Sequence, residues 1–206
     1  MKSMKLLFTL LFVAAIATVG FGQGIYGSAH DFSTKNWNTS GEICIVCHTP
    51  HGADVTVADA PLWNHQLTSA TFTVYTSSTI DATMGQPGAS SKLCLSCHDG
   101  TVAVDNYGGT TNGSVIVSGG DLIGTDLRSE HPISFTYDDA LATADGELFA
   151  PTTANSGLGS TIDADLLIGG KMECASCHDV HDAAGNSKLL VISNAASALC
   201  LTCHNK

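Results

Sequence analysis

Residues 44–51 read CIVCHTPH, and the pattern of the first five letters recurs three more times along the chain. The other copies are CLSCH at 94–98, CASCH at 174–178 and CLTCH at 200–204. Together the four copies contain all eight cysteines of the 206-residue sequence, so none is left over. The organisation of the chain is therefore decided by four Cys-x-x-Cys-His motifs.

This motif is typical of the attachment site of a c-type haem. In one helical turn the two cysteines and the histidine project to the same side. The thiols can then form thioethers to the porphyrin while the imidazole binds the iron. Four-cysteine zinc sites, disulfides and thioredoxin-like pairs also use paired cysteines, but none of them requires a histidine after every pair.

We therefore expect four covalently bound haem c groups. The cysteines that attach them are Cys44, Cys47, Cys94, Cys97, Cys174, Cys177, Cys200 and Cys203. The first ligands of the four irons are the motif histidines His48, His98, His178 and His204. Five further histidines, one more than four irons need, are candidates for the second ligand: His30, His51, His65, His131 and His181.

Two of these candidates follow a motif histidine by three residues: His51 follows His48, and His181 follows His178. Side chains one helical turn apart point the same way, with Cβ atoms about 5–6 Å apart. The two axial ligands of one iron lie on opposite faces of the porphyrin. We therefore expect His51 and His181 to bind the iron of a neighbouring haem, which would hold two haems together. The alternative is a hydrogen bond to a haem propionate or a backbone carbonyl.

The other three candidates differ in their surroundings. Pro132 biases His131 toward an extended conformation, and we expect His131 to be a ligand. One of His30 and His65 completes the set, and the sequence leaves open which one. Two imidazoles on every iron give a saturated haem of low potential. Saturated iron has no free site for a small substrate, so the pattern predicts electron transfer and not an enzyme.

The N-terminal residues and the net charge indicate where the protein is located and which partners it does not bind. Lysines at 2 and 5 precede an apolar run, which predicts a signal peptide over residues 1–22 with cleavage between 17 and 24. The alternative is a membrane anchor, but the run is short for a span of about 20 residues. A net charge of −11 without a basic patch argues against binding to nucleic acid or an anionic membrane.

The motifs form two similar pairs, which indicates an internal duplication. CIVCHTPHGA resembles CASCHDVHDA, and SSKLCLSCHDG resembles ASALCLTCHNK. We expect one domain over residues 23–206, built from two haem-pair halves at about 23–130 and 131–206. Its fold class is a small multihaem cytochrome c of mostly irregular loops. Short helices form at the haem motifs, a few short strands form where the composition is β-rich (70–77 and 114–120), and the haems form the core.

Most of the chain after residue 23 resembles the tetrahaem, doubled-CxxCH cytochromes c. The similar stretches are AHDFS, CIVCHTPHGA, PLWNH, SSKLCLSCHDGT, SEHPISF, MECASCHDVH and SNAASALCLTCHN. Some members of this group are subunits of extracellular filaments, or nanowires, in which one distal histidine reaches into the neighbouring subunit. The resemblance implies that His51 binds the haem of 94–98, His181 the haem of 200–204 and His131 the third haem. His30 or His65 is left for the first haem.

The resulting expectation is a secreted, extracellular electron conduit that polymerises into filaments, with a distal histidine donated between subunits. Redox proteins supply its electrons, and external acceptors receive them. One alternative is a monomeric periplasmic electron carrier in which every distal ligand is internal. Another is a small-molecule reductase with an open iron, which carbon monoxide would reveal.

Overall fold

A computed structural model describes residues 24–57 and 60–206 of the chain. The expected signal peptide, residues 1–22, lies outside the described residues. Among the residues that are described, no helix is both long and apolar enough to cross a membrane.

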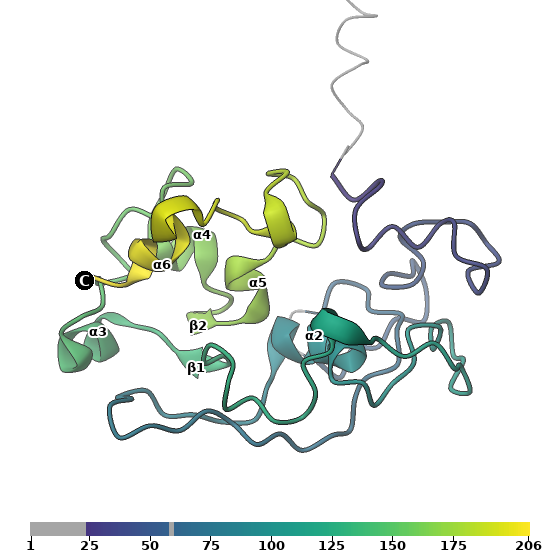
Figure 1. Ribbon diagram of the computed structural model, residues 1–206, viewed down its shortest axis with the longest axis horizontal. Coiled ribbons are helices and arrows are strands. Elements are labelled where there is room, and N and C mark those ends of the chain that lie inside the picture. Colours follow the sequence, from purple (N-terminus) through teal and green to yellow (C-terminus); the bar gives the residue numbers. More distant parts are fainter. Residues whose placement is uncertain (1–23, 58–59) are drawn as a thin grey trace, which may run out of the picture.

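Short helices joined by long irregular segments make up the described chain (Figure 1). The α-helices are α2 (Ala89–His98), α3 (Asp139–Asp145), α4 (Ile162–Leu166), α5 (Cys174–Cys177) and α6 (Ala198–Cys203). Three 3-10 turns are η1 (Gly119–Asp121), η2 (Ser187–Leu189) and η3 (Ala195–Ser197). One two-stranded antiparallel sheet pairs β1 (Phe135–Thr136) with β2 (Lys171–Met172), with Phe135 opposite Met172. A small, irregular fold with few short helices was the expectation, and the structure confirms it.

The predicted helical turns at the motifs are confirmed for three of the four copies. The second motif ends α2, the third forms α5, and the fourth lies in α6. The first motif forms a single turn, which is closed by a 2.8 Å hydrogen bond from the N–H of His48 to the carbonyl of Cys44. The same i to i+4 bond runs from His178 to Cys174 and from His204 to Cys200. Each motif therefore has the local geometry that places its cysteines and its histidine together.

The expected strands at 70–77 and 114–120 are wrong. In the first segment only Thr73 pairs, through an isolated parallel bridge to Asp126. In the second, the carbonyl of Val115 accepts one hydrogen bond from the N–H of Val104, and the segment runs into η1. A β-rich composition produces a strand only where a partner backbone lies alongside over several residues. The irregular segments next to these two stretches do not supply one.

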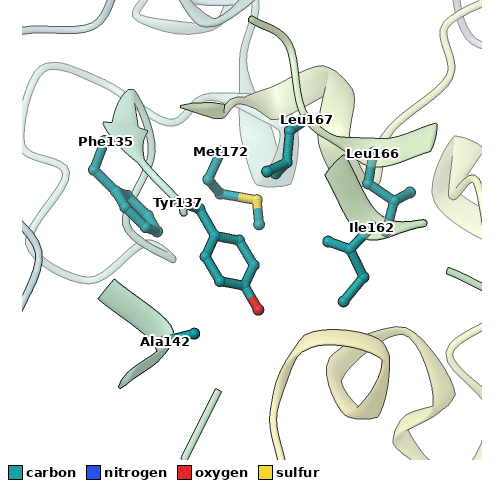
Figure 2. Packing of buried hydrophobic residues seen from close by; sticks show 7 residues of the cluster. All are labelled: Phe135, Tyr137, Ala142, Ile162, Leu166, Leu167 and Met172. Atoms are coloured by element: carbon teal, nitrogen blue, oxygen red, sulfur yellow. The ribbon is translucent and has the colours of Figure 1, made fainter. Parts of the chain in front are cut away.

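The apolar interior is divided into three small clusters. The largest gathers side chains from β1, α3, α4 and β2 around Tyr137 (Figure 2); its buried members are Phe135, Tyr137, Ala142, Ile162, Leu166, Leu167 and Met172. The second contains Val57, Trp63 and Leu93, and the third contains Phe72, Leu95 and Leu127. Motif cysteines pack at the margins of two clusters: Cys177 and Cys203 at the first, and Cys47 at the second. Three of the eight motif cysteines thus lie at the edge of the apolar interior.

Candidate haem-binding sites

The four motifs lie beside one another in the order in which they occur in the chain. Cys47 packs against the apolar cluster that contains Leu93 of α2, which places the first motif beside the second, and burial followed by the neighbouring Cys47 raises the pKa of the Cys97 thiol to about 12. Helix α2 packs against α5, and the N–H of Cys174 donates a 3.0 Å hydrogen bond to the Ser91 hydroxyl, so the second motif lies beside the third. Burial and the neighbouring Cys177 raise the pKa of the Cys203 thiol to about 11. The third motif therefore lies beside the fourth, and the attachment sites form a continuous series.

A buried carboxylate joins the second motif to the third. Glu173, which is 1% exposed, accepts a hydrogen bond from the Ser91 hydroxyl of α2 and a 2.8 Å bond from the Ser134 hydroxyl. The Ser91 oxygen in turn accepts a 3.0 Å bond from the N–H of Cys174. Among the described residues, the Oε1 atom of Glu173 has no hydrogen-bond partner. Sequence reasoning missed this residue, and its only signal is an acidic side chain directly before a CxxCH motif.

Three of the four motif histidines are held by a backbone carbonyl. The Nδ1 atoms of His48, His98 and His178 lie 2.5, 2.7 and 3.0 Å from the carbonyl oxygens of Pro61, Asp121 and Lys188. A carbonyl oxygen only accepts, so Nδ1 carries the proton in each case. The Nε2 lone pair of the neutral imidazole is then free to bind a metal, in a ring whose orientation is fixed. This is the arrangement expected of an iron ligand.

Three motif histidines also lie opposite a histidine from another part of the chain. The ring centroids are 6.2 Å apart for His48 and His181, 6.1 Å for His98 and His30, and 6.4 Å for His204 and His131. Burial, followed by the neighbouring His98, lowers the pKa of His30. The Nδ1 atom of His30 is buried and has no hydrogen-bond partner within the described chain. A buried polar atom without a partner calls for a further group when the site is complete.

His65 has a different environment. It is 2% exposed, and its Nδ1 and Nε2 atoms lie 2.8 and 2.9 Å from the carbonyl oxygens of Gln66 and Ala103. Burial lowers the pKa of His65. Both ring nitrogens therefore face backbone carbonyls. A neutral imidazole has a single N–H, so only one of the two nitrogens donates to its carbonyl. Nε2 also lies 3.5 Å from the Sγ atom of Cys97, so His65 is packed among backbone carbonyls beside the second motif.

Two histidines remain without such a partner. The ring of His178 has no second histidine opposite it in the part of the chain that the structure describes, and His51 likewise pairs with no motif histidine there. Both residues are exposed. The structure therefore supplies three motif histidines with a second imidazole and leaves the fourth without one.

These pairs differ from those that the family resemblance implies. His181 lies beside His48 and not beside the motif of 200–204, which His131 accompanies instead. The physical reason is a contact between helices that are far apart in the sequence. Helix α2 of the first half packs against α5 of the second, so the segment after α5 reaches back toward the first motif. The division into halves at about residue 130 stays a prediction.

The arrangement of the cysteines fits covalent haem. All eight are free thiols, so they form no disulfides. Within residues 24–57 and 60–206, no three Cys, His, Asp or Glu side chains converge on a common point where they would hold a metal ion by themselves. The cysteines at the cluster margins, the free Nε2 atoms and the facing imidazoles suit haem c, whose chemistry when bound is one-electron transfer.

Comparison with known proteins agrees with this assignment. Residues 168–206, which contain the third and fourth motifs, match the family defined by a doubled CXXCH motif. The match supports a multihaem c-type cytochrome, a class of protein that carries electrons. A comparison with curated proteins finds no match.

Proposed function

We propose that the protein conducts electrons through four covalently bound haem c groups, as the subunit of an extracellular filament. The observation that carries the electron-transfer part is the order of the attachment sites. Each motif lies beside the next: Cys47 packs with Leu93 of α2, α2 packs against α5, and Cys177 and Cys203 pack against the same apolar cluster. Groups attached to neighbouring cysteines lie close together, and an electron can then pass from each to the next over a short distance.

The histidines favour electron transfer over catalysis. An iron with an imidazole on each face has no open position where a small substrate can bind. Nine histidines for four irons are more than this arrangement requires. A bound haem c in such a site changes only its oxidation state.

The filament part rests on the two histidines without a partner. His178 lacks a second imidazole within the described chain, and His51 is exposed and lacks a motif histidine. If His51 of one subunit bound the iron at His178 of the next, that iron would have two imidazole ligands and neither histidine would be left without a partner. The subunits would then be joined through their haems. The chain would be secreted, and its partners would be copies of itself, redox proteins that donate electrons and external acceptors.

The haem count is tested on the native protein by its intact mass and by the pyridine haemochrome assay. Four haems per chain are expected. A smaller number would contradict the proposal at its first step, because at least one motif would then be empty.

The filament is tested with His51→Ala and a neighbouring exposed control, Val55→Ala. Val55 is 87% exposed and makes no polar side-chain contact, so its variant should form filaments under the electron microscope as the native protein does. His51→Ala should give single particles in which one haem in four binds carbon monoxide after reduction. Filaments of the His51→Ala variant without carbon monoxide binding would overturn the exchange. Native single particles with four unreactive haems would indicate the periplasmic carrier. Native filaments that bind carbon monoxide would indicate a reductase.

A further inference from the structure

The geometry assigns the second ligand of three irons within a single chain, which rests on the proposed function in that it requires bound haem. His181 binds the first iron opposite His48, His30 binds the second opposite His98, and His131 binds the fourth opposite His204. His65 is not an iron ligand. Its ring faces the backbone carbonyls of Gln66 and Ala103 and lies against Trp63, with no motif histidine opposite it within the described chain, so it is the surplus histidine of the sequence.

The ring separations carry this assignment. An imidazole nitrogen lies about 2.0–2.1 Å from a transition metal, and a ring centre lies about 1.1 Å beyond its nitrogen. Two imidazoles on opposite sides of one metal therefore have centroids about 6.2–6.4 Å apart. The three pairs have separations of 6.2, 6.1 and 6.4 Å. Each pair joins one motif histidine to one histidine outside the motifs, and no histidine is used twice.

Direct contact between the rings does not explain the spacing. Stacked rings approach to about 3.5–4.0 Å, the distance of carbon atoms in contact. The rings of His48 and His181 are nearly parallel, with an angle of 15° between their planes, yet their centres are 6.2 Å apart. Two of the three proposed second ligands also have an oxygen atom close to their Nδ1 atom. The Nδ1 atom of His131 lies 2.9 Å from the Pro132 carbonyl, and that of His181 lies 3.5 Å from an Asp179 carboxylate oxygen.

The N-terminal segment supports the first and second sites together. A Cβ atom added to Gly24 would lie 1.8 Å from the carbonyl oxygen of His181, so the backbone at residue 24 passes directly against His181. The same segment carries His30 to its position beside His98. His30 also packs edge-on against Phe32, at a centroid distance of 5.9 Å. The N-terminal segment thus carries one proposed second ligand, His30, and packs against another, His181.

Variants of His181 and of His65 should have opposite effects on the spin state of the haem irons. His181→Ala should convert one haem in four of the oxidised protein from low spin to high spin in the electron paramagnetic resonance spectrum. His30→Ala and His131→Ala should each do the same. His65→Gln should leave all four haems low spin, because no iron loses a ligand. A new high-spin haem in the His65 variant, or none in the other three, would overturn the assignment.

The individual pairs are tested by removing a haem. In a Cys44→Ala, Cys47→Ala chain, which lacks the first haem, His181→Ala should add no high-spin signal, whereas His131→Ala still should. If these variants do not fold, electron cryo-microscopy of the native haem-loaded protein decides the matter, because it shows which imidazole meets which iron. Four haems per chain with other pairs would overturn this inference and leave the proposed function standing. Fewer than four haems would overturn the proposed function itself.

Discussion

The buried carboxylate between the second and third motifs offers a quantitative test of how the haem sites are held together. Glu173 is 1% exposed and receives hydrogen bonds from two serine hydroxyls, one of which belongs to Ser91 of α2. Replacing Glu173 with alanine removes the acceptor that both hydroxyls share. The N–H of Cys174, which donates to the Ser91 oxygen, loses the orientation of its partner.

The magnitude follows from the two lost bonds. A hydrogen bond to a charged group contributes about 1.5–3 kcal/mol, so two such bonds give about 3–6 kcal/mol. Relief from burying a carboxylate with an unpaired Oε1 atom offsets part of this loss. We expect Glu173→Ala to lower the free energy of unfolding by about 2–4 kcal/mol. For a chain of this size the midpoint of thermal unfolding should fall by about 5–15 °C.

The assay is thermal unfolding of the haem-loaded protein, followed by far-ultraviolet circular dichroism and by the haem absorption band. Glu130→Ala is the matched control, because Glu130 is exposed, and its effect should stay within about 0.5 kcal/mol. Glu173→Gln keeps one acceptor oxygen and should fall between the two. If Glu173→Ala unfolds at the same temperature as Glu130→Ala, the carboxylate does not hold the two motifs together.

Three further outcomes can be checked with the same assay. Tyr137→Phe removes the 2.6 Å bond from a buried hydroxyl to the Phe149 carbonyl and should cost about 1–2 kcal/mol; an unchanged midpoint would contradict that role. Gly24→Ala places a Cβ 1.8 Å from the His181 carbonyl oxygen, so it should shift the N-terminal segment and destabilise the protein by about 1–3 kcal/mol. Burial acts to raise the pKa of Asp105, but donated backbone N–H groups hold it below its usual value. Its stabilisation is therefore complete above the unfolded pKa and is lost as the pH falls through the lower folded pKa. Asp105→Asn should destabilise the protein at pH 7, and the difference from the native protein should shrink as the pH is lowered through the acid range.

The helical turns at the motifs could be predicted because the spacing of the motif fixes them locally, whereas α3 and α4 lie away from the motifs and were not predicted. Two cysteines and a histidine reach one porphyrin only from a single turn, and the turn at Cys44 and the helices α5 and α6 all provide it. The strands could not be predicted by composition. Thr73 and Val115 lie in stretches as β-rich as any in the chain, but the backbone beside them is irregular. Pairing over several residues is a property of the whole fold and not of the segment.

The motif histidines could be singled out from the sequence as candidate first ligands, whereas the histidine that lies opposite each of them could not. His48 and His181 come together only because α5 packs against α2, a contact between the two halves of the chain. His30 and His65 were equivalent candidates by sequence. Their hydrogen bonds separate them, because both nitrogens of His65 face carbonyls while His30 lies opposite a motif histidine.

The spacing of His178 and His181 has a consequence for the path of the electrons. If His181 binds the first iron, the four residues 178–181 carry ligands of both the third and the first iron, and these two haems must be neighbours. The second and third motifs already lie side by side, because α2 packs against α5 and Ser91 accepts a hydrogen bond from the N–H of Cys174. The first three haems would then form a compact group in which each is close to the other two. The fourth haem, reached through Cys177 and Cys203, would extend from that group toward the C-terminus. The third haem, bound at His178, would lack a second ligand from its own chain. It would lie where this group of three haems meets the fourth, and a histidine from another copy of the chain could bind there and bring the haems of that copy close.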